Sequence, residues 1–306
     1  MRVAVTGGLG FIGAAVCRDL LTRGCEVHAI DHPAASRSRV ADVESSLTIH
    51  SADILDTDAT RALMQAVAPD TCIHLAWYVV PGKYLDASEN ISFIGASLRL
   101  IESAAEAGAT RFVGAGTCFE YRFGSDPIGE DSETRPTSVY AACKLATFTA
   151  GTALAEQLGI SFAWARLFYL YGPHEDENRL VPTVACRLLR GERAECTAGE
   201  LVRDYLHVDD VASGICVVAL SAVQGAVNVG SGRPVTLHTI INTIGRITGR
   251  SDLLDIGAMR RKAADPPLIC ADNTKLREAC GWESRFALED GLAQTIGWWR
   301  ERLLVD

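Results

Sequence analysis

The sequence predicts an α/β fold with a doubly wound parallel sheet that helices cover on both faces. Short apolar runs, each the length of a buried strand, alternate along the first half of the chain with longer segments of helical period. The crossover between two parallel strands is nearly always right-handed, and this favours a doubly wound sheet over other arrangements of the same strands. The predicted strands cover residues 2–6, 26–30, 71–75, 111–115 and 161–167, and the predicted helices cover residues 11–22, 59–67, 87–107 and 138–158.

The pattern changes after about Tyr171, where shorter elements alternate with Gly and Pro. We therefore expect a larger domain over residues 1–170 and a smaller lobe over residues 171–306. The two should interleave, with residues 205–230 returning to the larger domain. No repeat, low-complexity tract or linker rich in Pro, Gly or Ser separates them in the sequence.

The composition is that of a globular protein with a sizeable core: 306 residues, of which 48% are hydrophobic and 22% charged. The 29 basic and 38 acidic side chains give a net charge of −9, which argues against a partner such as nucleic acid or an anionic membrane. The first residues lack the basic start and cleavage site of a signal peptide, and residues 214–220, the most apolar later stretch, are too short to cross a bilayer. We expect a cytoplasmic protein.

The spacing of the ten cysteines is not that of a disulfide scaffold. They are spread from Cys17 to Cys280, without a CxxC pair and without the spacing of zinc ligands. We therefore expect no metal site, and free thiols in a reducing compartment.

The loop between the first predicted strand and the first predicted helix reads TGGLGFIG over residues 6–13. Gly7, Gly10 and Gly13 allow a tight turn, close approach of a pyrophosphate and close packing of helix on strand. The N–H groups at the start of the helix, around Phe11 and Ile12, would then point at the phosphates. The loop predicts a dinucleotide cofactor.

Asp31 follows the second predicted strand, at the position from which an acidic side chain accepts the adenosine ribose hydroxyls. Its carboxylate would repel a 2′-phosphate, so we expect NAD. Arg37 and Arg39 follow and would accommodate that phosphate if their loop folds back, so NADP stays an alternative. Asp31 could also simply begin the turn that contains Pro33.

Two further strand ends are candidates for the cofactor site. Asp53 and Ile54 follow an apolar run and would border the adenine, and Leu75 and Ala76 follow the next strand and would line the cofactor. His74 beside them is as often a structural residue.

Tyr140 and Lys144 lie four residues apart, one turn along the same face of a predicted helix. An ammonium group there would lower the pKa of the phenol and let Tyr140 exchange a proton near neutral pH. Lys144 would also hold the nicotinamide ribose. Thr117, after the strand over residues 111–115, would place a hydroxyl on a substrate oxygen. The alternatives are a surface helix pair and a turn-forming threonine.

In combination these residues resemble the extended short-chain dehydrogenase/reductase superfamily, in the branch that acts on nucleotide sugars. The resemblance implies a Rossmann fold, a catalytic triad of Thr117, Tyr140 and Lys144, and a homodimer formed through the helices at 87–107 and 138–158. The matching segments are residues 6–13, Asp31, 53–54, 74–76, Thr117, 140–144, 171–173, 203–210, 228–232 and 281–282.

Family members that eliminate water or decarboxylate carry an acidic residue two positions before the tyrosine of the Thr117 motif. Here that tyrosine is Tyr121, so the position holds Phe119, while Glu120 is displaced by one residue. This disfavours a 4,6-dehydratase or a decarboxylase. Residues 171–182, 196–205 and 255–261 resemble CDP-abequose synthase-like 4-ketoreductases, so the first expectation is reduction of the C4 ketone of a CDP- or dTDP-linked 4-keto-6-deoxyhexose. The alternative is an NAD-dependent 4-epimerase.

Two less favoured alternatives remain. Cys118 and His174 could act as an acid–base pair for a 3,5-epimerisation coupled to reduction, as in GDP-fucose synthase-like enzymes. A non-catalytic sensor of nicotinamide redox state would have no need of Tyr140, Lys144 and Thr117.

The resemblance also assigns contacts to the nucleotide diphosphate. Arg203 would bind the pyrophosphate, with Arg179 and the cluster over residues 260–262 as helpers. Asp265 would hold the nucleotide ribose. Tyr169 occupies the position of an asparagine that often contacts the substrate in relatives.

Overall fold

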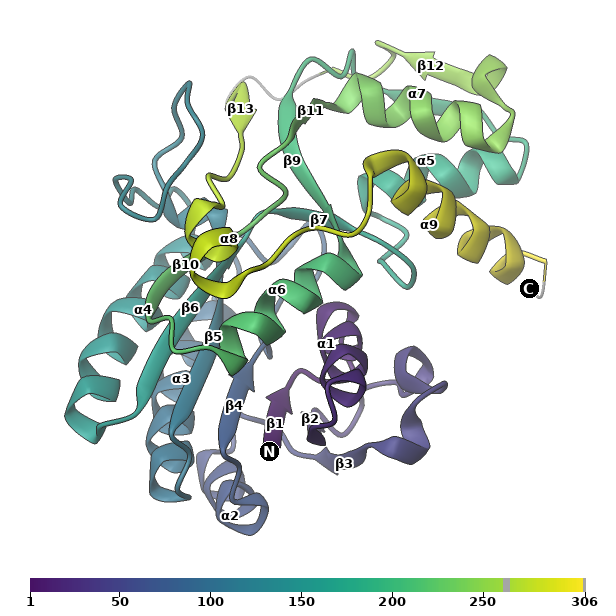
Figure 1. Cartoon of the computed structure of the whole chain (residues 1–306). Helices are drawn as coiled ribbons and strands as arrows, with labels where there is room; N and C mark the ends of the chain where they lie inside the picture. The colour runs from purple at the N-terminus through teal and green to yellow at the C-terminus, as the bar shows by residue number, and fades with distance from the viewer. Residues whose placement is uncertain (261–264, 305–306) are drawn as a thin grey trace.

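The computed structural model describes residues 1–260 and 265–304. Its centre is a seven-stranded parallel sheet in the order β10-β6-β5-β4-β1-β2-β3 (Figure 1). The doubly wound parallel sheet that the sequence predicts is thereby confirmed. The strands are β1 (Arg2–Thr6), β2 (Glu26–Asp31), β3 (Thr48–Ser51), β4 (Thr71–His74), β5 (Arg111–Thr117), β6 (Ser161–Leu167) and β10 (Gly225–Val229).

Helices cover both faces of this sheet. One face packs against α1 (Phe11–Thr22) and α6 (Val208–Leu220) through a continuous apolar core, and the other packs against α2 (Thr57–Val67), α3 (Glu89–Glu106) and α4 (Val139–Leu158). Helix α3 begins two residues later than expected, because the side chain of Asn90 bonds the carbonyls of Tyr84 and Ala87 and holds the preceding loop. No helix within the described residues is long and apolar enough to cross a membrane.

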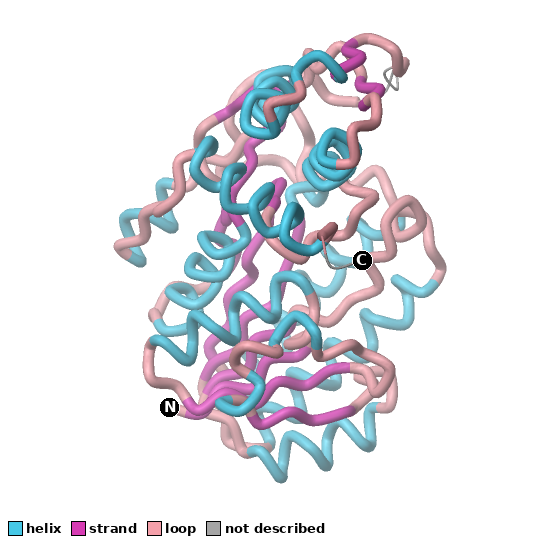
Figure 2. Tube along the Cα trace, turned by 90° about the vertical axis from the view of Figure 1, so that its right-hand side faces the viewer, coloured by secondary structure: helices cyan, strands magenta, loops and turns pink. Residues whose placement is uncertain are grey.

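The smaller lobe sits beyond the carboxyl ends of the central strands (Figure 2). Helices α5, α7 and α9 enclose their own apolar core, and β9 pairs with β7, β11 and β13 while β8 pairs with β12. The elements are β7 (Tyr169–Tyr171), α5 (Leu180–Leu189), β8 (Ala194–Cys196), β9 (Val202–His207), β11 (Pro234–Thr236), α7 (Leu237–Thr248), β12 (Leu254–Ile256), β13 (Leu268–Ile269), α8 (Thr274–Cys280) and α9 (Leu288–Arg302).

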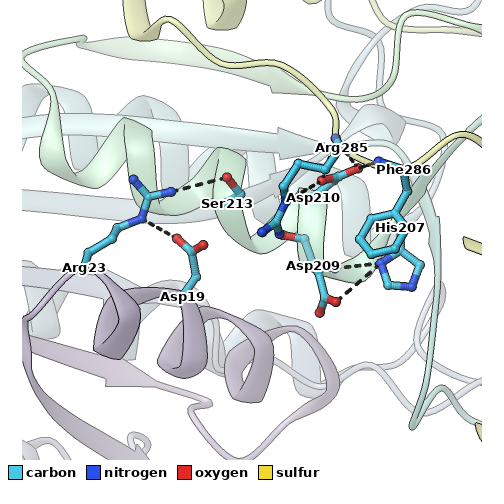
Figure 3. A network of polar contacts seen from close by, with 8 residues as sticks. All are labelled: Asp19, Arg23, His207, Asp209, Asp210, Ser213, Arg285 and Phe286. Atoms are coloured by element: carbon cyan, nitrogen blue, oxygen red, sulfur yellow. Dashed lines mark hydrogen bonds and ion pairs between the residues drawn. The ribbon is translucent and has the colours of Figure 1, made fainter. Parts of the chain in front are cut away.

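Buried polar contacts tie the lobe to the larger domain at helix α6 (Figure 3). Asp210, which is fully buried in the first turn of α6, accepts the backbone N–H groups of Arg285 and Phe286 at 3.0 Å, just before α9. About one turn further along α6, Ser213 accepts the exposed guanidinium of Arg23, which follows α1, at 3.3 Å. Helix α6 therefore links both parts of the molecule.

A second buried network holds the end of β5. Glu120 is completely buried, and its carboxylate accepts the N–H of Thr117 at 2.9 Å, the indole N–H of Trp164 at 3.0 Å and the guanidinium of Arg166 at 2.7 Å. Arg166 also lies over the ring of Tyr121. The network fixes the residues that follow β5 against the adjacent strand β6.

Replacing one partner of this buried pair should be costly. In Arg166→Met the Glu120 carboxylate would lose its cation while staying buried, so we expect the free energy of unfolding to fall by about 3–5 kcal/mol. The matched control is Arg122→Met, which breaks the exposed pair with Glu133 and should cost about 1 kcal/mol or less. Denaturant unfolding measures both variants, and equal losses would contradict the role given to Glu120.

Candidate active site

A cavity of about 780 Å³ lies between the carboxyl ends of the central strands and the smaller lobe. The ends of β1, β2, β4 and β5 meet there, as expected for a ligand site of an open α/β sheet. The structure brings the predicted cofactor residues together along its wall: Gly7, Gly10, Phe11, Ile12, Gly13, Asp31, Asp53, Ile54, Leu75, Ala76, Tyr140 and Lys144.

The glycine-rich loop has no room for side chains. A Cβ atom on Gly13 would lie 1.9 Å from the carbonyl oxygen of Gly7, and Gly7 has a φ of +71° that favours glycine. The loop is held by the N–H of Gly7, which donates to Ile30 at 2.8 Å. Helix α1 begins without a side-chain cap, so the N–H groups of its first turn are free for an anion. The cradle fits the pyrophosphate of a dinucleotide.

The Asp31 carboxylate lies beside this loop. It accepts the N–H of Leu9 at 2.9 Å and that of His32 at 2.8 Å, and each oxygen keeps further capacity to accept ribose hydroxyls. Arg37 is paired with Glu44 at 2.9 Å, and Arg39 lines the cavity and donates to the carbonyl of His174 at 3.2 Å. The arrangement fits NAD.

His74 is a structural residue. Its two ring nitrogens bond the hydroxyls of Thr6 at 2.7 Å and Ser97 at 2.9 Å, inside the core. Burial lowers the pKa of His74 to about 3, so the ring is neutral at physiological pH. Only its neighbours Leu75 and Ala76 reach the cavity.

Thr117 and Tyr140 meet at the end of β5. The Thr117 hydroxyl accepts the N–H of Phe119 at 3.3 Å, so this residue is a turn former, and it lies close enough to the Tyr140 phenol to lower the pKa of that group. Both side chains are buried and line the cavity. Tyr84 packs edge-on against Tyr140, with ring centroids 4.9 Å apart. Two hydroxyl groups therefore face one point of the cavity.

Lys144 lies one helical turn from Tyr140. Its ammonium group donates to the carbonyl of Ala115 at 2.7 Å and sits 3.8 Å from the centre of the Trp77 ring. Burial lowers the pKa of Lys144 from its ordinary value of 10.5 to about 7. Burial also raises the pKa of Tyr140, while the Thr117 hydrogen bond lowers it. The pKa of Tyr140 is therefore raised and not lowered as expected, because desolvation outweighs the groups that favour the phenolate.

The cavity continues towards the smaller lobe. We call this part, lined by Phe119, Tyr169, Glu175, Arg179 and Tyr205, the lobe-side end. Phe119 faces the cavity, whereas Glu120 points into the protein towards Arg166.

The predicted substrate residues separate into two groups. Thr117, Cys118 and Arg179 line the cavity, and the Arg179 guanidinium lies 5.4 Å from the Tyr84 ring. Arg203 is buried behind Tyr169 and donates to the carbonyls of Val202 and Pro266, so it does not line the cavity.

Asp265, beside Pro266, is not among the residues that line the cavity. Residues 261–262 of the proposed cationic cluster lie outside the described residues.

The structure does not place His174 at the substrate. Its ring packs at a tilt of 46° against Trp298 with centroids 4.4 Å apart and lines a separate cavity of about 350 Å³ together with Arg18 and Asp42. Cys118 lines the main cavity instead, and burial raises the pKa of its thiol. An acid–base pair of Cys118 and His174 is therefore ruled out by position.

Sequence reasoning missed several cavity residues. Trp77, Tyr84 and Tyr205 carry no local pattern that separates them from core aromatics. Glu175 begins the acidic run Glu175-Asp176-Glu177, which is typical of a solvated loop, yet its side chain is buried while the next two are exposed. The sequence alone does not show which of these three carboxylates is buried.

The lowered pKa of Lys144 has a consequence for stability. Between about pH 7 and its ordinary value of 10.5, the unfolded chain keeps a proton on Lys144 that the folded chain has lost, so this group makes stability rise with pH. Lys144→Met should reduce the rise of Tm between pH 7 and 10, measured without NAD. The exposed Lys83→Met is the control and should keep it, and identical pH slopes for wild type and Lys144→Met would refute the assignment.

The chain is similar to known enzymes along most of its length. A family model described as "NAD dependent epimerase/dehydratase family" matches residues 3–230. A UDP-glucose 4-epimerase of Streptomyces lividans is 29% identical, over 92% of this chain and 91% of that protein. A dTDP-glucose 4,6-dehydratase of Streptomyces niveus is 27% identical, over 98% and 93%.

Solved structures agree with this similarity. The UDP-glucose 4-epimerase of Thermotoga maritima with UDP-glucose superposes with a TM-score of 0.88 at 27% identity, over 99% of this chain and 100% of that one. The cradle at Gly7 and Gly13, the Asp31 carboxylate and the family match agree on the cofactor, which is NAD. The chain belongs to the NAD-dependent epimerase/dehydratase family, the extended short-chain dehydrogenases/reductases that act on nucleotide sugars.

Proposed function

We propose that this protein is an NAD-dependent nucleotide-sugar 4-epimerase. The observation that carries the proposal is one cavity whose wall holds the glycine-rich loop and Asp31 together with Thr117, Tyr140 and Lys144, and on which Phe119 offers no group for proton transfer. The similarity to UDP-glucose 4-epimerases supports the same reaction.

In this reaction Thr117, Tyr140 and Lys144 have different roles. Bound NAD supplies a two-electron hydride acceptor and donor for C4 of the sugar. Thr117 orients the C4 oxygen by a hydrogen bond. Tyr140 takes the proton from the C4 hydroxyl as a phenolate and returns it to the same oxygen as a phenol. Lys144 holds the nicotinamide ribose. Inversion requires that both faces of C4 be presented to the nicotinamide in turn.

Elimination of water from the sugar needs a further acid or base. Phe119 cannot transfer a proton, and the Glu120 carboxylate is occupied by Arg166, Trp164 and the Thr117 backbone. We therefore propose that the enzyme is not a 4,6-dehydratase, although such an enzyme is among its relatives. The test below includes a dehydration product.

A second candidate is reduction of the C4 ketone of a CDP- or dTDP-linked 4-keto-6-deoxyhexose. The sequence resemblance of residues 171–182 and 196–205 to 4-ketoreductases favours it, and the same Tyr140 would then donate the proton. For either reaction we propose that Arg179 binds the diphosphate, since it is the guanidinium on the wall of the lobe-side end.

We also propose a homodimer through α3 and α4. Ile91 on α3 is 61% exposed and Val139 on α4 is 38% exposed, and these two helices pack against each other.

The reaction is tested with purified protein, NAD and UDP-glucose, UDP-galactose or their N-acetylamino counterparts, with the products separated by chromatography. We expect the C4 epimer to form with wild type. Tyr140→Phe should lower the rate by about 10²–10⁴-fold and leave NAD affinity unchanged, because only the proton donor is lost. Phe119→Ala is the control and should keep most of the activity.

The alternatives give different products in the same experiment. Stoichiometric loss of NADH absorbance with CDP- or dTDP-4-keto-6-deoxyglucose, without epimerisation of any substrate, would replace the epimerase by the ketoreductase. A product lighter by one water would establish a dehydratase. Near-full activity of Tyr140→Phe would refute the catalytic assignment in all three cases.

Asp31 should decide the choice between NAD and NADP. In Asp31→Asn the charge is lost at nearly constant shape, so the ribose hydroxyls lose a charged acceptor and a 2′-phosphate is no longer repelled. We expect NAD affinity to fall about tenfold and the preference for NAD over NADP to shrink, as measured by calorimetric titration. Asp126→Asn, on an exposed loop away from the cavity, should change neither value.

A further inference from the structure

One carboxyl group on the cavity wall has no role in the reaction described so far. The side chain of Glu175 is only 9% exposed, and its Oε2 atom is buried without a hydrogen-bond partner among the described residues. Within residues 1–260 and 265–304, the backbone of Gly172 is the hydrogen-bonding group that lowers the pKa of this carboxyl. Because a buried carboxyl without partners costs free energy, its retention on a cavity wall points to a ligand.

The neighbouring carboxylates show that this burial is specific. Asp176 is exposed and accepts the N–H of Asn178 at 2.9 Å, which forms the turn, and the exposed Glu177 pairs with Arg190. Those two side chains account for the local structure of the loop. Glu175 makes no contact of this kind, and of the two carboxylates that this loop places on the cavity wall, Glu175 and Asp176, it is the buried one.

The backbone before Glu175 is held in a strained conformation. His174 has a φ of +70°, in the left-handed region that a non-glycine residue seldom adopts. Its ring packs at a tilt against Trp298 of α9, and its carbonyl accepts the Arg39 guanidinium at 3.2 Å. The larger domain and α9 thus hold His174 from two sides, and the consequence is that Glu175 is turned inward.

The charges around Glu175 narrow the choice of ligand. Burial raises the pKa of Glu175 to about 8, against the opposing effect of Arg179. At neutral pH the group is therefore mostly a carboxylic acid, which both donates and accepts a hydrogen bond, as a sugar hydroxyl does. A ligand with an ammonium group would be repelled by the positive charge of Arg179. The chemistry fits a neutral hydroxyl.

We propose that the Glu175 carboxyl binds a ring hydroxyl of the nucleotide-linked sugar and thereby selects which sugars the cavity accepts. The proposal rests on the proposed function, because it assumes a nucleotide sugar in this cavity. It makes Glu175 a specificity-determining residue and does not give it a step in proton transfer at C4.

The test separates sugar binding from nucleotide binding. Calorimetric titration of the full-length protein with bound NAD compares UDP with UDP-glucose, and likewise dTDP and CDP with their glucose conjugates. The variants are Glu175→Leu, which removes both hydrogen-bonding oxygens, and Glu175→Gln, which keeps a donor and an acceptor. Glu177→Leu, two residues along the same loop, is the matched control.

We expect Glu175→Leu to weaken the best nucleotide sugar at least tenfold while the affinity of the free nucleoside diphosphate stays within threefold. Glu175→Gln and Glu177→Leu should keep both affinities within threefold. The unchanged nucleotide affinity shows in each case that the variant is folded.

Two results would overturn the proposal, and they differ. If Glu175→Leu keeps the affinity for the nucleotide sugar, Glu175 does not bind the sugar, and the proposed function stands. If no sugar conjugate binds wild type more tightly than its nucleoside diphosphate, the assumed class of substrate is wrong, and the proposed function falls together with the role of Glu175.

Discussion

The geometry of the active site depends on a carboxylate that takes no part in the reaction. Glu120 joins the end of β5 to β6 through the N–H of Thr117, the indole of Trp164 and the guanidinium of Arg166. The chain turns after β5, and Glu120 holds this turn through the N–H of Thr117. The turn keeps the Thr117 hydroxyl near the Tyr140 phenol. The displacement of the acidic residue by one position, from 119 to 120, thus exchanges a possible proton donor in the cavity for a buried structural anchor, which links the proposed reaction directly to the fold.

The second constraint is the low polarity of the cavity. Burial is the largest influence on the pKa values of Tyr140, Lys144 and Glu175, and in every case it favours the neutral form. Lys144 keeps its amine over the Trp77 ring and against a carbonyl, where a cation gains some stabilisation without an anionic partner. The proton that leaves the sugar oxygen needs a basic acceptor, which Tyr140 provides only as a phenolate, and the nearby Lys144 ammonium group would balance that charge.

The sequence predicts the cofactor end of the site far better than the lobe-side end. Gly7, Gly10, Gly13 and Asp31 lie within two neighbouring strand–loop units, so their spacing along the chain fixes their spacing in space. The same holds for Tyr140 and Lys144 on one helix turn. His174 and Arg203 follow equally recognisable motifs, but their side chains depend on Trp298 and Pro266, which lie 124 and 63 residues further along the chain. Contacts over such distances along the chain leave no local sequence pattern. The sequence therefore predicts His174 and Arg203 in the cavity, whereas the structure has Glu175 there instead.

The lobe-side end selects its ligand with few polar groups. Tyr84, Phe119, Tyr169 and Tyr205 supply aromatic faces, which pack on the apolar surface of a sugar ring with little regard to the configuration of its hydroxyls. Discrimination then falls to buried groups that lose a hydrogen bond when the matching hydroxyl is absent, since such a loss is far more costly than a small change in apolar contact. At the lobe-side end, Glu175 is such a buried group, and the strained backbone at His174 keeps its carboxyl on the cavity wall.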